Sequence, residues 1–361
     1  MTASILKEAI EKASQGRRLD QEQALLLYEK TDLLTLGRLA GTTRFRHNPA
    51  SMATYAVDRN INYTDICVSG CAFCAFYKEK DDPDAYVMDR ETLNRKCNET
   101  IDLGGTQILY QGGLNPGLDI AWHEQQVAFM KSKGLHVHGY SPPEIVFMAQ
   151  KEGIPIHDVI ERLKDAGLGS IPGGGAEILV DRVRRKISPN KASTSQWLEV
   201  MRSAHNLDLK TTATMMFGHV ETLEERMLHL SAIRELQDET GGFTAFIPWP
   251  YQPGKNTLSG RAAGGTPYLR TLAISRIFLD NIPHVQASWV TQGHHIGQIA
   301  LHFGADDMGS TMIEENVVAS AGVRNAMTQW DIIRLIETAG FEAVQRNTLY
   351  QPVEKGTEAA P

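Results

Sequence analysis

The chain has 361 residues, of which 42% are hydrophobic and 22% are charged, and its formal net charge at pH 7 is −7. This composition supports a large buried core and excludes a chain that is disordered throughout. Acidic and basic residues are interspersed without long runs of one sign, so we expect neither a nucleic-acid-binding stripe nor a polybasic membrane surface. Small molecules are therefore the expected partners.

Two features of the sequence indicate the compartment. No apolar run approaches the roughly 20 residues that a membrane span requires, and the start, MTASILKEAIEKASQGRRLD, lacks the apolar core of a signal peptide. We therefore expect a cytoplasmic protein. Three of the four cysteines lie between Cys67 and Cys74, which makes a poor disulfide framework. Clustered cysteines in a reducing compartment favour a metal site. Nothing in the sequence indicates the oligomeric state.

The predicted elements alternate along the chain. A helical prelude covers 19–47, and a short strand follows at 61–68. Six further strands are expected at 106–113, 135–142, 169–178, 210–220, 243–253 and 285–293, and one last strand candidate follows them. Helical patterns precede them at 89–105, 118–134, 143–167, 195–209, 222–242, 268–284 and 294–311, the last of which leads into the final strand. This alternation predicts an α/β fold, a (β/α)8 TIM-type barrel rather than an open doubly wound sheet.

The barrel prediction also sets the expected organisation of the chain. We expect an N-terminal helical extension over residues 1–50, the barrel over 51–350 and a C-terminal tail over 351–361. In such a barrel the chemistry lies at the carboxyl ends of the strands. The unusual segments of this chain fall at those ends: the cysteine loop CVSGCAFCAFY, QGGLNP, SPPE, GGGAEI, FGHVET, PWPYQPGK, WVTQG and GADDMGST. Each could be a surface turn, but their common position predicts one pocket.

The spacing of Cys67, Cys71 and Cys74 is C-x3-C-x2-C. Three thiolates bind three irons of a 4Fe-4S cluster and leave the fourth iron open. An open iron can chelate the amino and carboxylate groups of a small ligand, and S-adenosylmethionine offers both. The alternative is a structural zinc site with a histidine or Cys97 as fourth ligand, but such sites usually show two separated ligand pairs. Cys97 lies in a helical pattern, which predicts a buried thiol.

The cysteine spacing resembles that of the radical S-adenosylmethionine enzymes. This resemblance implies a 4Fe-4S cluster on the three cysteines and S-adenosylmethionine as cofactor, which is cleaved to a deoxyadenosyl radical. It also implies that Phe73 lies against the adenine. Gly112 and Gly113 after the second strand resemble the family's two-glycine stretch, where the backbone approaches the methionine amino group.

Further cofactor contacts are expected around GGGAEI. The Glu177 carboxylate can accept hydrogen bonds from ribose hydroxyls or an ammonium. An arginine fork can hold the methionine carboxylate at two points, and we take Arg184 as the candidate, with Arg182 and Arg185 as alternatives. At least two of these three arginines are expected on a solvated helix face.

The resemblance narrows further when several segments are taken together. NYTDICVSGCAFCAFY, GGTQILYQGGLNP, YSPPEI, GGGAEI, ASWVTQG and GADDMGSTMIEENVV resemble the group that joins the menaquinone futalosine enzymes and the deazaflavin synthase subunits, over nearly the whole chain. WVTQG and GADDMGSTMIEENVV are most similar to the cyclases of the futalosine pathway. The resemblance implies dehypoxanthine futalosine as substrate and abstraction of the hydrogen at the 4′ carbon of its ribose. It further implies radical addition to the benzoate ring and an electron donor such as flavodoxin or ferredoxin.

Alternatives remain within the group and outside it. Aminodeoxyfutalosine synthases and deazaflavin synthase subunits share the cysteine loop and the GGGAEI pattern. A non-catalytic iron-sulfur or zinc protein is the alternative of a different class. The colour of the protein and its cleavage of S-adenosylmethionine would separate these classes.

The cyclase reaction needs a base for the ring proton and contacts for the sugar and the ring. His219 is the first candidate for the base because its unperturbed pKa lies nearest the operating pH, and the alternative is a backbone hydrogen bond at the strand end. Glu221 and Asp306 are further catalytic candidates. The substrate-binding candidates are Trp249, Tyr251, Trp289 and Gln292, with the barrel core as the alternative for the tryptophans.

Several other polar residues follow the last predicted strand or form histidine pairs. Asp307, Glu314 and Glu315 lie near the end of that strand, where one member of each acidic pair could cap a helix. His136 and His138 are alternate residues of a strand and are expected on one face, whereas the adjacent His294 and His295 point apart. We expect no second metal.

Overall fold

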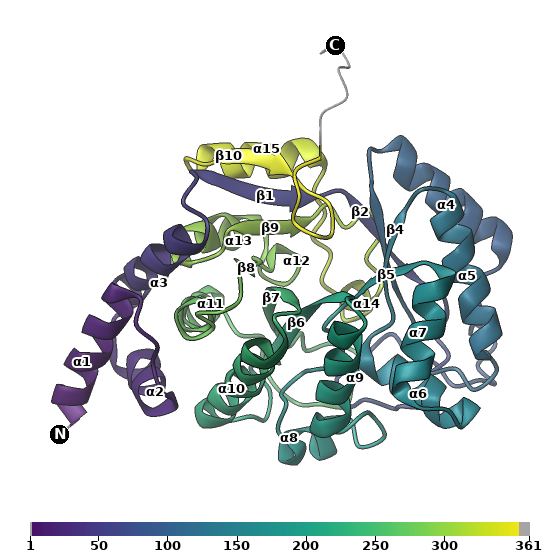
Figure 1. The fold of residues 1–361 in the computed structure, drawn as a ribbon, viewed down its shortest axis with the longest axis horizontal. Coiled ribbons are helices and arrows are strands. Elements are labelled where there is room, and N and C mark those ends of the chain that lie inside the picture. The colour runs from purple at the N-terminus through teal and green to yellow at the C-terminus, as the bar shows by residue number, and fades with distance from the viewer. Residues whose placement is uncertain (1, 354–361) are drawn as a thin grey trace, which may run out of the picture.

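The computed structural model describes residues 2–353. Three helices precede the first strand: α1 (Thr2–Gln15), α2 (Gln21–Lys30) and α3 (Leu33–His47). They extend from one side of the molecule (Figure 1). Asp20 begins α2 by accepting a hydrogen bond from the Gln23 amide, and Asp32 begins α3 in the same way through Thr35. A helical extension was predicted here. The predicted tail, residues 351–361, lies mostly outside the described residues.

The strands form two parallel sheets. The larger contains β2 (Asp58–Asn62), β3 (Gln107–Gln111), β4 (His136–Gly139), β5 (Leu168–Ile171), β6 (Lys210–Phe217), β7 (Phe243–Pro250) and β8 (His284–Val285), in that order. The smaller has the order β10 (Glu342–Gln345), β1 (Met52–Ala56), β9 (Asp307–Ser310). Only Val57 separates β1 from β2, so one bent strand belongs to both sheets.

Backbone hydrogen bonds between β8 and β9 close these sheets into a barrel. The Ala287 amide donates to the Asp307 carbonyl at 2.8 Å, and the Asp306 amide donates to the Val285 carbonyl at 3.1 Å. On its other side β9 pairs with β1. The bent strand β1–β2 and strands β3 to β9 therefore complete the ring of eight, which confirms the predicted (β/α)8 fold. β10 pairs with β1 outside the ring and was not predicted.

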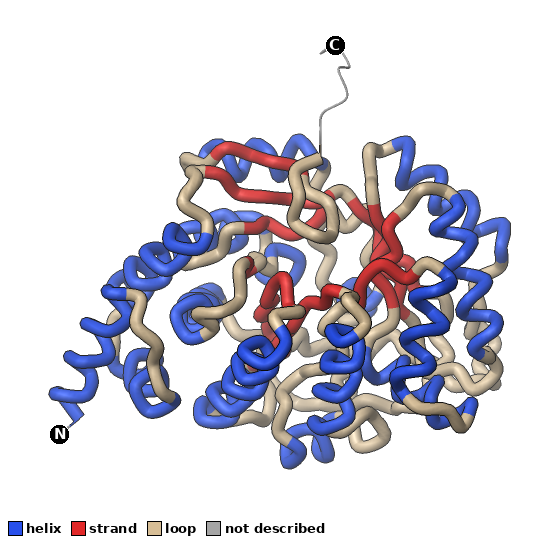
Figure 2. The backbone as a smooth tube through the Cα atoms, in the orientation of Figure 1, coloured by secondary structure: helices blue, strands red, loops and turns tan. Residues whose placement is uncertain are grey.

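Helices surround the strands, as Figure 2 shows in blue around red. They are α4 (Arg90–Asp102), α5 (Ile120–Ser132), α6 (Pro142–Glu152), α7 (Ile156–Ala166), α8 (Asp181–Ile187), α9 (Thr194–Asn206), α10 (Leu223–Thr240), α11 (Gly265–Phe278), α12 (Trp289–Gln292), α13 (His294–Ala300), the 3-10 turn Leu301–Phe303, α14 (Val317–Ser320) and α15 (Gln329–Thr338). Within residues 2–353, none of the helices combines the length and apolar character that a bilayer crossing needs.

The structure corrects several predicted boundaries, among them the strand expected over 169–178, which ends at Ile171. The helix expected over 143–167 is two helices, because Gly153 takes a φ of 68° at the end of α6 and Pro155 precedes α7. The strand expected over 285–293 ends at Val285, and WVTQ forms α12 instead. The first barrel strand begins at Asp58 rather than at 61, since its sequence DRNIN carries polar residues that face the barrel interior and so lacks an apolar alternation.

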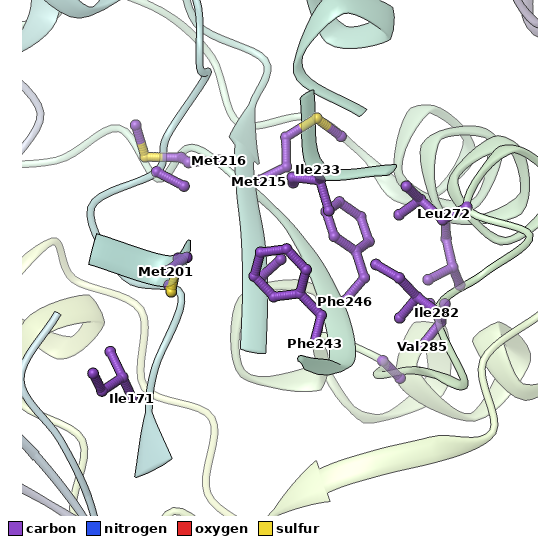
Figure 3. Packing of buried hydrophobic residues seen from close by; sticks show 14 of the residues in the cluster. Ile171, Met201, Met215, Met216, Ile233, Phe243, Phe246, Leu272, Ile282 and Val285 are labelled. Atoms are coloured by element: carbon purple, nitrogen blue, oxygen red, sulfur yellow. The ribbon is translucent and has the colours of Figure 1, made fainter. Parts of the chain in front are cut away.

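The apolar core lies between the strands and the helices. Figure 3 shows Phe246 of β7 packed toward Ile233 of α10 and Leu272 of α11, and Phe243 of the same strand packs against α9. These four side chains are at most 2% exposed. Burying each such side chain stabilises the fold by about 1.5–3 kcal/mol. This outer core holds the strands in place, so the barrel interior can be polar.

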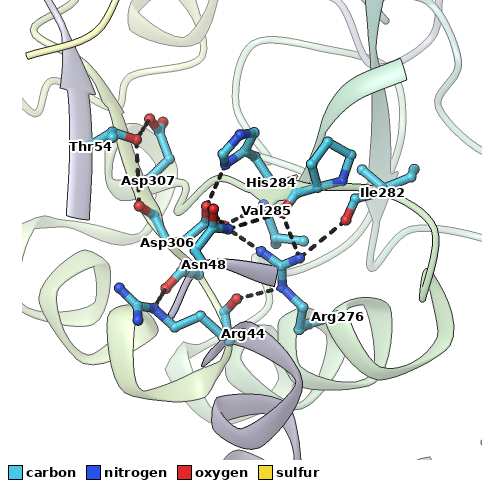
Figure 4. A network of polar contacts seen from close by, with 12 residues as sticks. Arg44, Asn48, Thr54, Arg276, Ile282, His284, Val285, Asp306 and Asp307 are labelled. Carbon is cyan, nitrogen blue, oxygen red and sulfur yellow. Dashed lines mark hydrogen bonds and ion pairs between the residues drawn. The ribbon is translucent and has the colours of Figure 1, made fainter. Parts of the chain in front are cut away.

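A buried ionic network joins the extension to the last strands (Figure 4). The Asp306 carboxylate accepts hydrogen bonds from the Arg276 guanidinium, from Asn48 Nδ2 at 2.7 Å and from the Val285 amide at 2.8 Å, and His284 Nδ1 lies 2.5 Å away. Burial opposes ionisation of Asp306, but the Arg276 charge and the His284 hydrogen bond lower its pKa. The network therefore fastens α3, α11 and β8 together.

Candidate functional site

A cavity of about 440 Å³ occupies the barrel interior and opens at the carboxyl ends of the strands. All three cysteines of the predicted motif line it, together with Phe73 and Gly112 to Leu114. Parallel barrels place their active sites at this end. The predicted pocket is thus present, and the cysteine loop forms part of its wall.

Backbone hydrogen bonds hold the cysteine loop against the barrel rim. The Cys67 amide donates to Lys78 at 3.1 Å, and the Val68 amide donates to Leu114 at 3.1 Å. The Ala72 amide donates to Ile187 at 2.8 Å. Segments from three parts of the chain therefore fix the loop, which presents its thiols in one orientation.

The donor set of the loop fits an iron-sulfur cluster. Cys67, Cys71 and Cys74 are free thiols, and Ser69 Oγ lies 3.1 Å from Cys71 Sγ. Burial raises the pKa of each of the three thiols. Among the described residues, no three His, Cys, Asp or Glu side chains converge closely enough to hold a single metal ion. A 4Fe-4S cluster does not need such convergence, because each thiolate binds a different iron.

The two glycines after β3 allow the strand to pack against this loop. A Cβ atom on Gly113 would lie 2.2 Å from the Ile66 carbonyl oxygen, and one on Gly112 would lie 2.7 Å from the Tyr63 ring. Glu144 Oε1 accepts hydrogen bonds from the Gly112 amide at 3.0 Å and from the Tyr63 hydroxyl at 2.7 Å. The glycines therefore serve the close approach of β3 to the cysteine loop, and both line the cavity.

Glu177 is a strained and incompletely bonded residue in the cavity wall. Its φ of 39° lies in the left-handed region, and the residue is 4% exposed. Oε1 accepts a hydrogen bond from Lys191 Nζ at 2.9 Å, whereas Oε2 has no hydrogen-bond partner in residues 2–353 and lies 3.6 Å from Arg184 Nη1. Strained backbone and unsatisfied buried polar atoms gather at functional sites. A bound cofactor with a hydrogen-bond donor would satisfy Oε2.

Lys191, rather than an arginine, is the cation that lines this part of the cavity. Its Nζ lies 5.3 Å from the centre of the Phe73 ring, so it sits beside the cysteine loop. Burial opposes its charge, but Cys71 and Glu177 raise its pKa. The sequence did not identify Lys191, because a single lysine in a loop carries no signal of its own.

Arg184 is buried but does not line the cavity. Its guanidinium donates to the backbone carbonyls of Gly175, Ala176 and Ala192, and it is 3% exposed. It therefore supports the loop that carries Glu177. Arg182 pairs with Glu225 on the outer side. The predicted contact of Arg184 with a methionine carboxylate finds no geometric support here.

The inner wall of the cavity is polar. Side chains from successive strands line it: Asp58, Asn60, Asn62, Gln107, Gln111, His138, Thr212, Thr214, Gln286 and Ser310. Asp58 accepts a hydrogen bond from Gln107 Nε2 at 3.0 Å and another from the Ser310 hydroxyl, while burial raises its pKa. Amide, hydroxyl and carboxyl groups of this kind suit the hydroxyls of a sugar.

The substrate-binding candidates divide into two groups. Trp249 and Trp289 line the cavity, and Trp289 Nε1 donates to the Ser310 carbonyl at 3.2 Å. Tyr251 is 1% exposed, and its hydroxyl donates to Asn256 Oδ1 at 2.7 Å. Gln292 Nε2 donates to the Ala263 carbonyl at 3.1 Å. Tyr251 and Gln292 thus belong to the fold around the cavity rather than to its wall.

The predicted catalytic residues lie outside the cavity wall. His219 Nε2 lies 2.9 Å from the Met216 carbonyl oxygen, and His219 Nδ1 accepts a hydrogen bond from the Val220 amide at 2.8 Å. Glu221 accepts hydrogen bonds from the amides of Gly218 and His219 and pairs with Arg226. Both side chains are fully buried, so the backbone alternative weighed for His219 is the arrangement observed.

The acidic residues at the last strand are likewise engaged in the fold. Asp306 belongs to the ionic network of Figure 4. Asp307 pairs with Arg346, and Glu314 pairs with Arg59. Glu315 lines the cavity, but its carboxylate accepts the backbone amides at the start of α14. Paired acidic residues in the sequence therefore mark structural contacts here.

Two family models and several curated proteins match this chain. Residues 61–233 match the radical SAM superfamily, and residues 240–359 match the CofH/MqnC C-terminal region. The chain is 44% identical over 352 residues to the cyclic dehypoxanthine futalosine synthase of Streptomyces coelicolor, covering 96% of this chain and 88% of that protein.

Two further similarities bear on fold and family. The chain is 41% identical over 304 residues to the 5-amino-6-(D-ribitylamino)uracil–L-tyrosine 4-hydroxyphenyl transferase of Archaeoglobus fulgidus, covering 82% of this chain and 88% of that protein. The structure of methylornithine synthase matches with a TM-score of 0.75 at 16% identity, covering 93% of this chain and 97% of that one. The structural match concerns the fold alone.

Proposed function

The chain belongs to the radical S-adenosylmethionine superfamily and, within it, to the family of the cyclic dehypoxanthine futalosine synthases, and from this membership we propose how its residues cyclise dehypoxanthine futalosine in the futalosine route to menaquinone. The observation that carries the proposal is the joint position of the three cysteines and Glu177 on one cavity at the carboxyl ends of the strands. The enzymes of this superfamily use a 4Fe-4S cluster and S-adenosylmethionine.

The chain's part in cofactor binding follows from the site. Cys67, Cys71 and Cys74 would hold the cluster, which together with S-adenosylmethionine supplies a deoxyadenosyl radical that removes a hydrogen atom from the substrate ribose. Glu177 Oε2 would accept a hydrogen bond from a donor group of the bound cofactor, and Lys191 places a positive charge beside Glu177. Phe73 offers an aromatic face to the adenine.

Substrate binding uses the polar inner wall. Asn60, Asn62 and Thr214 offer neutral hydrogen-bonding groups to the sugar, and Trp249 offers an apolar face to the benzoate ring. Trp289 is fixed by its hydrogen bond to Ser310 and supports the same side of the cavity. The enclosing barrel excludes bulk water, which protects a carbon radical until it has added to the ring.

Two wider expectations accompany this function. We propose that a low-potential donor such as flavodoxin or ferredoxin reduces the cluster, since Val68 and Tyr77 of the cysteine loop are 52% and 37% exposed and a partner can approach there. We also propose that the protein works in the cytoplasm, where its free cysteines stay reduced.

The test is an anaerobic product analysis. The cluster is reconstituted, and S-adenosylmethionine, a strong reductant and dehypoxanthine futalosine are added. We expect a product two hydrogens lighter than the substrate, matched by deoxyadenosine. Deoxyadenosine without that product would reject the cyclase activity, and no deoxyadenosine from an intact cluster would reject radical chemistry altogether.

A further inference from the structure

A hydrogen-bonded chain of three side chains runs along the inner wall of the barrel, away from the cysteine loop. His138 Nδ1 lies 2.6 Å from Ser170 Oγ, and His136 Nε2 lies 2.8 Å from the same oxygen. His138 and Ser170 are register partners on β4 and β5. The two histidines point to one face because they are alternate residues of a strand. Of the three, only His138 was named above, as part of the polar cavity wall.

The two ends of this chain face different surroundings. His138 lines the cavity, and its Nε2 has no hydrogen-bond partner among residues 2–353. His136 is the first residue of β4, at the amino end of the strands, and is partly exposed. The chain therefore leads from the interior of the barrel toward its opposite end.

Gly169 of β5 provides the space that the His136 ring occupies. A Cβ atom on Gly169 would lie 2.4 Å from Cε1 of the His136 ring and 2.8 Å from its Nδ1. Only a glycine in β5 therefore lets the His136 ring lie against the strand and reach Ser170. The position of the His136 ring therefore requires a glycine at residue 169, since any larger residue would displace the ring.

The hydroxyl of Ser170 has a single proton, so it donates to one histidine and accepts from the other. In one arrangement His138 Nδ1–H donates to Ser170, Ser170 donates to His136, and His138 Nε2 presents a lone pair to the cavity. A proton taken up at Nε2 moves the whole chain to the opposite arrangement, with one proton released at His136. Neither imidazole has to remain charged.

The charges around the pair favour neutral rings. Burial, His136 and Arg346 lower the pKa of His138 to about 3, and burial and Lys131 lower the pKa of His136 to about 4. The nearest hydrogen-bonding neighbour of both rings is the uncharged Ser170. At neutral pH both rings are therefore able to accept and pass on a proton.

The cyclisation releases one proton inside this cavity. A hydrogen atom leaves the ribose for the deoxyadenosyl radical, and the new carbon–carbon bond forms to the benzoate ring. The attacked ring carbon must then lose a proton and the ring radical one electron, for which the oxidised cluster would be the acceptor. An aromatic ring that is being restored is a strong acid at that carbon, so a weakly basic imidazole suffices.

We propose that His138 Nε2 accepts the ring proton, and that Ser170 and His136 pass it to solvent at the amino end of the barrel. This inference rests on the proposed cyclase function. It makes His138 a catalytic residue, and it makes Ser170 and His136 residues of a proton path.

The first test measures how often an abstraction leads to product. With wild-type protein the ratio of cyclised product to deoxyadenosine should approach one. In His138→Gln, deoxyadenosine should still form, whereas the ratio should fall by about 100-fold, the usual contribution of a general base. Deuterium on the attacked ring position should then slow product formation in His138→Gln and leave the wild type unaffected.

Matched variants separate the proton path from general disturbance. Ser170→Ala and Gly169→Ala leave His138 in place and should each lower the ratio less than His138→Gln does. His205→Gln is the control, because His205 is a partly buried histidine bonded to the hydroxyls of Thr240 and Thr211 and does not line the cavity. It should leave the ratio unchanged.

A second measurement does not depend on turnover. Nitrogen NMR of the histidine-labelled protein, assigned with His138→Gln and His136→Gln, should show both rings neutral from pH 8 down to pH 5.5. A charged His138 ring at pH 7 would overturn the proposal, as would an unchanged ratio in a His138→Gln protein that still makes deoxyadenosine. Wild-type protein that makes deoxyadenosine but no cyclised product would overturn the cyclase function and the proton path together.

Discussion

Two buried ionic groups of this barrel differ in how completely they are bonded. At the junction of α3, α11 and β8, Asp306 has partners on both carboxylate oxygens: Arg276 and the Val285 amide on Oδ1, and Asn48 and His284 on Oδ2. At the cavity rim, Glu177 has one hydrogen bond and a left-handed backbone. A fully bonded buried carboxylate holds elements together, whereas an incompletely bonded and strained one leaves capacity for a ligand. The number of hydrogen bonds to the carboxylate, not the residue type, therefore distinguishes the structural Asp306 from the candidate ligand-binding Glu177.

The largest effect should come from the cysteine loop. Replacing Cys67, Cys71 or Cys74 by Ser should abolish the brown colour near 400 nm and all cleavage of S-adenosylmethionine, because the cluster loses one of three protein ligands. Cys97→Ser is the matched control, since Cys97 is buried in α4 away from the cavity. Iron content and absorbance after anaerobic reconstitution check this, and a Cys97→Ser protein without iron would contradict it.

The next effect concerns stability at the α3–α11–β8 junction. Asp306→Ala should lower the free energy of unfolding by about 3–5 kcal/mol, because it leaves the fully buried Arg276 charge without its carboxylate. Denaturant unfolding of the protein measures this. A decrease in the free energy of unfolding below 1 kcal/mol would show that the ionic network does not stabilise the junction of α3, α11 and β8.

Glu177→Gln should affect cofactor binding more than the stability of the fold. It removes one charged hydrogen bond, so the stability loss should be smaller than that of Asp306→Ala, about 1–3 kcal/mol. Its binding of S-adenosylmethionine should weaken about tenfold or more, which corresponds to one charge-assisted hydrogen bond. Equilibrium binding to the reconstituted protein checks this, and wild-type affinity in the variant would remove Glu177 from the cofactor site.

The smallest effect is the acid dependence of stability. The pKa of Asp306 is lowered in the folded protein, so its contribution is present above the unfolded value of about 3.9 and is lost as pH falls through the folded value. The wild type should therefore lose stability in acid below about pH 4. Asp306→Asn should show a shallower loss over the same range. Identical acid profiles for the two proteins would contradict this assignment.

The sequence predicted the barrel well, and it placed the three cysteines at the end of the barrel where the structure has its cavity, because both predictions rest on spacing. Strand patterns alternate with helical patterns to give eight predicted strands, and the C-x3-C-x2-C spacing indicates three cysteine ligands for one iron-sulfur cluster. Boundaries were less accurate where local rules compete, as at Gly153 or in the polar strand that begins at Asp58. β10 could not be predicted, since a four-residue edge strand carries no period of its own.

The catalytic candidates were harder to predict, because position along a strand does not determine the direction of a loop side chain. His219 and Glu221 follow β6 as expected, yet they turn toward their own backbone. His138 and Lys191 line the cavity although neither belongs to an unusual motif. The alternation that placed His136 and His138 on one face was the available signal. The structure confirms the shared face, since both rings lie within hydrogen-bond distance of Ser170.

The most direct test of the central claim asks whether the cavity brings the substrate ribose to the cofactor above the cysteine loop. Dehypoxanthine futalosine with deuterium at the 4′ carbon would be turned over once, and the deoxyadenosine analysed by mass spectrometry. We predict that the deoxyadenosine gains one deuterium. Deoxyadenosine that forms in step with cyclised product but carries no deuterium would contradict abstraction from that carbon, and with it the proposed arrangement of substrate and cofactor in the cavity.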